Sequence, residues 1–386
     1  MTEQDLVIGL DSSTTACKAV VWDLQGKAVA VGRAPLPMIM PRPGWHEQPA
    51  VAWWEAALQA LRYAAAQVEP GRLAAISISA QRETFVITDA AGEPLGNALL
   101  WMDERASDLL PEIETRYGKE RFHQETGKPL STNLSVCKLL WLRQHQPELF
   151  TQPIRILDVH AFLTHQMTGK WVTSWGCADP MGLFDMRQNC WNADLIKAVG
   201  LSVNQFPEAQ PVGSFIGNLL PEVCQAASLP AGIPLYAGIG DGQAAGLGVS
   251  LNQPGEAYLN LGTAVVSGTF SDRYLVAPAF RTMYGGLPGS YVLETVLLGG
   301  AYTINWFMQK ISGLSENAHF SEPAALQLME KEAAQIPPGA QGLTLVPYWN
   351  GAMNPYWDAS ASGIIVGWRG IHGRAHLYRA ILEGIA

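Results

Sequence analysis

The sequence predicts an α/β protein of two domains, and three observations support this. The chain has 386 residues, which is long for one typical domain. An apolar strand, Pro234–Ile239, leads into a glycine-rich turn and a small-residue helix from about Gln243. Two strand–turn–strand units with hydroxyl-bearing turns, around Asp11–Lys18 and Gly262–Thr263, stand near the start of each half. Because Gln253-Pro-Gly255 is typical of a boundary, we expect domains at residues 1–250 and 251–386.

Composition excludes several classes of protein. The net charge of −9 argues against a nucleic-acid partner, and an anionic ligand would have to be held by local groups. Although 48% of the residues are apolar, no run is long enough to span a bilayer, and no signal segment opens the chain. The cysteines lack metal-binding spacing and indicate buried thiols in a reducing, cytoplasmic compartment; they are Cys17, Cys137, Cys177, Cys190 and Cys224.

The N-terminal segment is expected to form a β-meander. Its strands are predicted at Leu6–Leu10, Ala19–Trp22 and Ala28–Gly32. The polar turn Asp11–Lys18 could wrap phosphate oxygens with backbone N–H groups and hydroxyls, with Lys18 adding charge. Taken alone, an ordinary Ser/Thr-rich hairpin turn explains it better.

Two later strands end in residues suited to a polyol. A helix over Ala50–Gln67, with Trp53 and Trp54 in the core, precedes the strand Leu73–Ser79, which ends in Gln81-Arg82-Glu83. Arg82 donates and Glu83 accepts, so the pair could grip adjacent hydroxyls; the alternative is a surface ion pair. After the next apolar run, Trp101 could cover a sugar face while Asp103 accepts from a hydroxyl.

The remaining elements complete two similar halves. Helices are expected at Ser107–Tyr117, Ser135–His145 and Asp194–Val199, with another after Asp158 as its N-cap. In the second half, strands Tyr258–Leu261 and Val265–Phe270 enclose the Gly262–Thr263 turn. Two meander domains that face a central cleft, each with a phosphate turn, correspond to the actin-like (ribonuclease H-like) arrangement.

The stretch Gly238–Gly248 contains one charge, Asp241, between Gly240 and Gly242. A carboxylate at a strand's C-terminal end and beside a helix N-terminus lies where open α/β sheets bind ligands. Asp241 is therefore a candidate catalytic base. An ordinary Asp N-cap is the alternative that the stretch alone leaves open.

These segments resemble the FGGY family of carbohydrate kinases. Ser135–His145 resembles the family's first signature, and Gly363–Gly367 followed by His376–Glu383 resembles the second. Asn133 and Trp368 depart from the usual residue types. The resemblance covers the chain from Leu6 to its end, and its layout is similar to xylulokinases and glycerol kinases.

The resemblance implies a role for each candidate residue. Asp241 matches the base that takes the proton from the attacking hydroxyl, and Asp11 matches an acidic residue near Mg²⁺ and the phosphates. The ATP phosphates are assigned to the two turns, at Thr14, Thr15 and Lys18 and at Gly262 and Thr263. The sugar is assigned to Gln81, Arg82, Glu83, Trp101, Asp103, Asn133 and Asp241.

The implied activity is ATP-dependent phosphorylation of a sugar or polyol, with a xylulose-like ketopentose favoured. Trp101-x-Asp103-x-Arg105 resembles xylulokinases, whereas Arg82-Glu83 resembles glycerol kinases, so a glycerol or polyol kinase is the alternative. A homodimer is left open as the assembly.

The last helix, Ala375–Ala386, lacks a stop signal, and family members continue into a glycine-rich adenosine loop. We therefore expect an incomplete second domain that binds ATP weakly, which would make the chain a sugar-binding relic without catalysis. We also expect an exposed apolar face at Leu377, Ile381 and Leu382.

Overall fold

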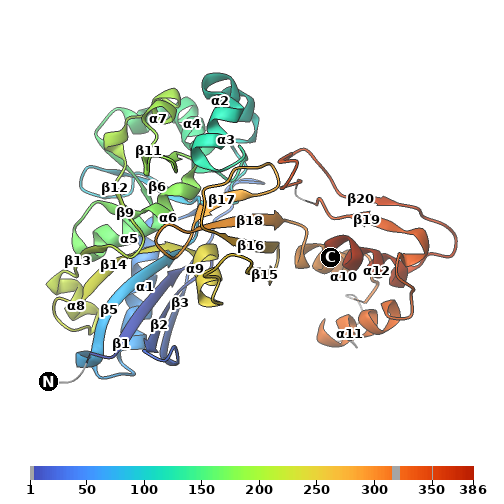
Figure 1. Ribbon diagram of the computed structural model, residues 1–386, viewed down its shortest axis with the longest axis horizontal. Helices are drawn as coiled ribbons and strands as arrows, with labels where there is room; N and C mark the ends of the chain where they lie inside the picture. The colour runs from blue at the N-terminus through green and yellow to red at the C-terminus, as the bar shows by residue number, and fades with distance from the viewer. Residues whose placement is uncertain (1–3, 315–321, 350) are drawn as a thin grey trace. The chain divides into compact units, whose positions relative to one another are not determined.

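The computed structural model describes residues 4–314, 322–349 and 351–386, and the chain divides into two compact units (Figure 1). The first unit comprises Met1–Glu256, Phe270–Val276 and Thr282–Val292. The second comprises Ala257–Thr269, Ala277–Arg281 and Leu293–Ala386. The first unit thus includes residues on both sides of the predicted boundary at 250/251.

A six-stranded sheet organises the first unit. Its order is β13-β14-β5-β1-β2-β3, with bounds β1 Leu6–Ser12, β2 Ala16–Asp23, β3 Ala28–Pro35, β5 Leu73–Ala80, β13 Phe215–Asn218 and β14 Pro234–Gly240. The first three strands form the predicted antiparallel meander, whereas β5 runs parallel to β1 and β14 parallel to β5. In this register Ser12 pairs with Ala80, and Ala80 with Gly240, so three parallel strands end at one edge.

Helices cover one face of this sheet because their small and aromatic residues fit against its apolar side chains. The helices are α1 Ala50–Ala65, α5 Val159–Thr168 and α8 Pro221–Ala227 (Figure 1). Trp53 has no exposed surface, and its ring meets Phe162 edge-on with centroids 5.7 Å apart. The prediction that Trp53 belongs to the core is confirmed.

A second core lies around a smaller sheet of order β4-β7-β6-β8. Its strands are β4 Glu47–Gln48, β6 Phe85–Asp89, β7 Ala98–Leu99 and β8 Ile154–Asp158. The helices nearby are α2 Leu110–Tyr117, α3 Lys119–Thr126, α4 Ser135–His145, α6 Trp175–Ala178 and α7 Ala193–Ala198. Short strand pairs complete the region, β9 Val172–Ser174 with β12 Glu208–Gln210 and β10 Phe184–Asp185 with β11 Cys190–Trp191.

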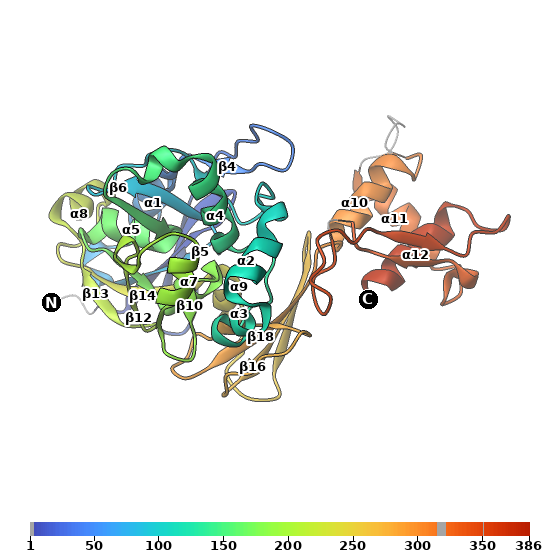
Figure 2. The same cartoon turned by 90° about the horizontal axis from the view of Figure 1, so that it is seen from above.

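The chain then forms a four-stranded sheet of order β15-β16-β18-β17. Its strands are β15 Ala257–Leu261, β16 Val265–Ser271, β17 Arg281–Tyr284 and β18 Tyr291–Leu297. Later elements of the second unit are α10 Ala301–Lys310, α11 Glu322–Ala333, β19 Thr344–Val346, β20 Ile364–Val366 and α12 Arg374–Ile385. Figure 2 shows α10, α11 and α12 beside one another. Their buried side chains form one core with strand β19, and this core includes Phe307, Met329 and Leu345.

Short 3₁₀ turns join several of these elements: Pro70–Arg72, Ser107–Leu109, Pro147–Phe150, Asp179–Met181, Val203–Gln205 and Ala340–Gly342. Helix α9, Asp241–Gly248, follows β14 directly. No helix among the residues described is long and apolar enough to cross a membrane.

The fold corrects three local predictions. The first turn is only Ser13–Thr15, because Asp11 and Lys18 are cross-strand partners in β1 and β2. The expected exposed face on the last helix is wrong at Leu377 and Ile381, which are 3% and 0% exposed and belong to the core of the second unit. Among the cysteines, Cys190 is exposed rather than buried, because it lies in the short β10–β11 hairpin.

Candidate active site

Polar side chains from three distant segments meet where β1, β5 and β14 end together. Asp11 lies near the end of β1, Arg82 follows β5, and Asp241 follows β14. The Nε atom of Arg82 lies 3.2 Å from Oδ1 of Asp241. Carboxyl ends of parallel strands are the usual ligand-binding edge of an α/β sheet, and the predicted site residues Asp11, Arg82 and Asp241 lie at this edge.

Asp241 is not the N-cap of α9. Gly240 occupies the N-cap position with extended backbone angles, and Asp241 is the first helical residue. Its Oδ1 accepts a hydrogen bond from the N–H of Gly242 at 2.7 Å. Burial raises the pKa of Asp241 to about 6, against the opposing charge of Arg82, while the nearby carboxylates Glu83 and Asp11 raise it further. The side chain nevertheless keeps 42% of its surface accessible, so a ligand can reach it.

Two glycines allow β14 to approach its neighbours closely. A Cβ atom at position 238 would lie 1.7 Å from the carbonyl oxygen of Ile78, and one at position 240 would lie 2.6 Å from Cγ of Arg82. Position 238 therefore requires glycine, because the clash is with backbone, whereas a larger residue at position 240 would displace the Arg82 and Gln243 side chains. The glycine-rich pattern in the sequence reflects this contact, which brings the Arg82 side chain against the strand that carries Asp241.

The Asp11 carboxylate stands beside the hairpin turn. Its Oδ1 accepts a hydrogen bond from the Ser79 hydroxyl at 2.6 Å. Burial raises the pKa of Asp11, and the Ser79 hydrogen bond and the Lys18 charge oppose that shift. A partly exposed carboxylate with one oxygen hydrogen-bonded fits a water-mediated Mg²⁺ ligand, since that ion keeps most of its waters.

Thr14 joins the turn to the predicted sugar-binding loops. Its hydroxyl donates to Gln81 Oε1 at 3.2 Å and accepts from Trp101 Nε1 at 3.0 Å. Its backbone carbonyl accepts from Gln48 Nε2 at 2.6 Å. The Thr14 hydroxyl is thus part of the internal network, whereas Thr15 and Lys18 are exposed. Phosphate binding by these three residues stays a prediction.

The turn Gln81-Arg82-Glu83 lies below the surface. Gln81 and Glu83 are 3% and 5% exposed, and the Arg82 side chain is 10% exposed. Glu83 has φ of 55°, in the left-handed region that non-glycine residues seldom adopt. Such strain clusters at binding sites. The geometry therefore disfavours a surface ion pair at Arg82 and Glu83, and sugar binding by this turn stays a prediction.

Asp103 is engaged within the protein. Its Oδ1 accepts from Arg105 Nε at 2.8 Å, and its Oδ2 accepts from the His46 N–H at 2.7 Å and from Arg105 Nη2 at 2.8 Å. Arg105 also pairs with Glu47 and stacks over the Trp45 ring at 3.9 Å. Through these partners Asp103 holds the loop that carries Trp101. Its internal hydrogen bonds do not favour the predicted contact with sugar, which stays a prediction.

Asn133 precedes α4, and its backbone carbonyl accepts a hydrogen bond from Lys138 Nζ at 2.8 Å. The loop of Asn133 is thereby linked to helix α4. Contact between the Asn133 side chain and a sugar stays a prediction.

The second turn, Gly262–Thr263, lies at the start of α10 within the second unit. The carbonyls of Gly262 and Thr263 accept from the N–H groups of Ala301 and Tyr302 at 3.0 and 3.1 Å. A Cβ atom on Gly300 would lie 3.0 Å from both carbonyl oxygens. The contact between this turn and the start of α10 was not predicted from the sequence. The Gly299-Gly300 pair before a helical segment is the pattern that indicates it.

Sequence reasoning also missed a buried acid close to Arg82. Asp179 has no exposed surface, and its Oδ2 accepts from the Tyr284 N–H at 2.7 Å and lies 3.4 Å from Lys128 Nζ. Burial raises its pKa to about 6, opposed by the charges of Lys128 and Arg82. No motif marks Asp179, because its neighbours come from distant parts of the chain.

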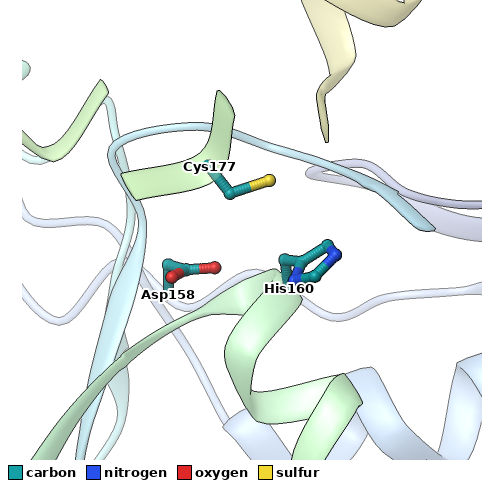
Figure 3. Close-up of side chains that lie close together, drawn as sticks. All are labelled: Asp158, His160 and Cys177. Carbon is teal, nitrogen blue, oxygen red and sulfur yellow. The ribbon is translucent and has the colours of Figure 1, made fainter. Parts of the chain in front are cut away.

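Figure 3 shows a buried group, Asp158, His160 and Cys177, whose potential ligand atoms lie within 4.8 Å of one another. The Nε2 atom of His160 accepts from the Gly238 N–H at 3.1 Å, so the neutral ring carries its proton on Nδ1. Burial lowers the pKa of His160 to about 4, which keeps the ring neutral. Asp158 caps α5, as predicted, by accepting from the Ala161 N–H at 3.0 Å. The Nδ1 atom lies 3.4 Å from the Thr164 hydroxyl oxygen, so both ring nitrogens of His160 have hydrogen-bond partners. We therefore assign His160 to holding β14 and not to binding a metal.

Comparisons with known proteins agree with this geometry. Residues 6–248 match the N-terminal domain of the FGGY family of carbohydrate kinases, and residues 257–386 match its C-terminal domain. The chain is 32% identical to a glycerol kinase of Thermococcus onnurineus and 30% identical to a xylulose kinase of Escherichia coli, each alignment covering 98% of this chain and 76% of the relative. Its structure superposes on a xylulose kinase from Rhodospirillum rubrum with a TM-score of 0.90 at 27% identity, covering 98% of this chain and 76% of that one.

These matches confirm the predicted α/β fold with the two-domain architecture of actin-like sugar kinases. They also confirm that the enzyme class is that of a phosphotransferase, as the resemblance implied. The chain belongs to the FGGY family of carbohydrate kinases.

Proposed function

We propose that the protein transfers the γ-phosphoryl group of ATP to a hydroxyl of a ketopentose or polyol, with Asp241 as the general base. The observation that carries the proposal is the Asp241 carboxylate, accessible and 3.2 Å from Arg82, at the shared end of three parallel strands. A base with a pKa near 6 is ionised at neutral pH and still accepts a proton as the nucleophile forms.

The neighbouring side chains orient the substrate. Arg82 donates hydrogen bonds and Glu83 accepts them, so a vicinal pair of hydroxyls can bind both. Trp101 supplies an aromatic ring, held by its Nε1–H bond to Thr14 and by its backbone N–H bond to Thr84 at 3.0 Å. Because phosphoryl transfer depends mostly on positioning and charge stabilisation, this rigid support suits the reaction.

The phosphates are assigned to the two turns. In the first unit, backbone N–H groups and the charge of Lys18 are assigned to phosphate binding, and in the second unit the Gly262–Thr263 turn is assigned to it. Asp11 would hold Mg²⁺ through water, and the ion supplies neutralisation of charge on the phosphate oxygens. The hydrogen bond from Ser79 keeps the Asp11 carboxylate oriented for this role.

Two substrate classes remain as candidates, each supported by a particular feature. A xylulose-like ketopentose is favoured by Trp101-x-Asp103-x-Arg105 and by similarity to xylulose kinases. Glycerol or another short polyol is favoured by Arg82-Glu83 and by similarity to glycerol kinases.

A coupled ADP-release assay on the 386-residue chain tests the proposal. It uses a panel of ketopentoses and polyols with Mg-ATP, and a parallel thermal-shift screen reports sugar binding without turnover. We expect one substrate class to give saturable turnover, although the pattern of the last helix alone indicated weak ATP binding without catalysis. Stabilisation by a sugar with no turnover in the presence of Mg-ATP would instead support a sugar-binding relic without catalysis.

A further inference from the structure

Lys138 connects three loops that approach the sugar site from different parts of the chain. Its Nζ atom donates to the carbonyl oxygens of Glu83 at 3.1 Å, Leu100 at 2.8 Å and Asn133 at 2.8 Å. These carbonyls belong to the turn after β5, the segment before Trp101, and the loop before α4. One ammonium group therefore supports all three.

Burial makes these contacts consequential. Lys138 has no exposed surface, and it lies on α4 among the buried residues Cys137, Leu139 and Leu140. An ammonium group has three donors and no acceptor, which matches three carbonyls one for one. Water cannot replace a donor in a dry site, so losing Lys138 removes one donor from each of the three carbonyls. The Glu83 carbonyl would keep the Ser135 hydroxyl and the Leu100 carbonyl would keep the Asp103 N–H.

The Glu83 carbonyl is held by a second donor from the same helix. It also accepts from the Ser135 hydroxyl at 3.0 Å, so two donors from α4 hold a residue whose φ is 55°. A strained backbone persists only where its surroundings fix it. Helix α4 thereby fixes the direction of the Arg82–Glu83 turn.

The charged groups around Lys138 come from each neighbouring element. Asp103 and Glu83 favour the ammonium form, whereas Arg105 opposes it. Cys137, on the same helix, is a neutral thiol because burial raises its pKa to about 12. Burial is the largest effect and lowers the pKa of Lys138 to about 8. A neutral amine has two donors and one lone pair, so deprotonation removes one of the three hydrogen bonds that Lys138 donates to these carbonyls.

We propose that Lys138 is a positioning residue for the sugar site: its ammonium group holds the loops of Glu83, Trp101 and Asn133 in their binding arrangement. This rests on the proposed function of those loops. Sugar affinity should then depend on the protonation of Lys138, and nucleotide affinity should not.

The test compares Lys138→Met with Ser135→Ala, which removes one neutral donor from the same Glu83 carbonyl. Sugar KM and ATP KM are measured from pH 6.5 to 9.5. For Lys138→Met we expect a sugar KM raised about tenfold or more and an unchanged ATP KM. The sugar KM of the parent protein should rise above about pH 8, whereas that of Lys138→Met should not change with pH. Ser135→Ala should raise sugar KM less and keep the alkaline dependence.

Hydrogen–deuterium exchange without sugar separates this inference from the proposed function. The amides of Trp101, Asp103 and Leu134 are hydrogen-bonded within the three-loop region. Lys138→Met should increase their exchange together, and Ser135→Ala should not. If the parent protein turns over no sugar but Lys138→Met still loosens these amides, the positioning role stands and the proposed function fails.

Several results would overturn the inference. One is an unchanged sugar KM in folded Lys138→Met, and another is loosening of a single loop alone. If Lys138→Met does not fold, the parent protein decides: a sugar KM that stays constant from pH 7 to 9.5 would reject the role of the ammonium group.

Discussion

Replacement of Asp241 by Asn should abolish most turnover while leaving the sugar bound. Asn has the same size as Asp and keeps an oxygen that can accept a hydrogen bond from the Gly242 N–H. In the parent protein this N–H donates to Oδ1 of Asp241 at 2.7 Å. It removes the base, and a positioned general base contributes about 10²- to 10⁴-fold to rate. We therefore expect kcat to fall by about 10²-fold or more and the sugar dissociation constant to change by only about threefold.

The pH dependence of kcat/KM provides a second quantitative test of Asp241 as the base. With a pKa of about 6, the Asp241 carboxylate is mostly ionised at pH 7 and mostly protonated at pH 5. Activity needs the ionised form, so kcat/KM should fall by about tenfold from pH 7 to pH 5. A carboxyl at the ordinary value of 3.8 would stay ionised over this range, and activity would hardly change.

The assay is coupled ADP release across this pH range, with calorimetry for sugar binding. Asp194→Asn is the matched control, because that carboxylate is 70% exposed and pairs with Arg121 at the surface. The reasoning is refuted if Asp241→Asn retains kcat within about threefold of the parent protein, or if it shows the same acid limb.

The remaining predictions probe the surroundings of the base. Glu83→Gln should raise sugar KM by about tenfold without changing ATP KM, because a neutral amide oxygen replaces a charged acceptor. Steady-state kinetics measures both constants, and a sugar KM equal to that of the parent protein would show that Glu83 does not contact the sugar. His160→Leu should lower the free energy of unfolding by about 1–3 kcal/mol, because the buried Gly238 N–H loses its acceptor. His160→Gln should lower that free energy by less. Chemical denaturation measures both values, and equal decreases would count against the hydrogen bond. Gly300→Ala should raise ATP KM by about three- to tenfold and leave sugar KM unchanged, because its methyl group would press on the Thr263 turn. Calorimetry measures the ATP dissociation constant, and an unchanged value would contradict this prediction.

Much of the local structure could be predicted from the sequence. The first meander, helix α1 and the strand leading to Asp241 follow from patterns of apolar, glycine and hydroxyl residues over short windows. Helix α3 was missed, because its residues Lys119–Thr126 are mostly polar and its first turn follows Gly118. The predicted role of Asp241 as base came from the glycines around it and from the family resemblance.

Only the tertiary structure decided which candidates meet and what each one contacts. The parallel register of β1, β5 and β14 brings Asp11, Arg82 and Asp241 together, although more than 150 residues separate Arg82 from Asp241. The ion pair with Arg105 commits Asp103 to its own loop. Local patterns report which face of an element is apolar, but a buried charge is defined by its partners, and those partners come from distant segments that only the folded chain brings within hydrogen-bonding distance.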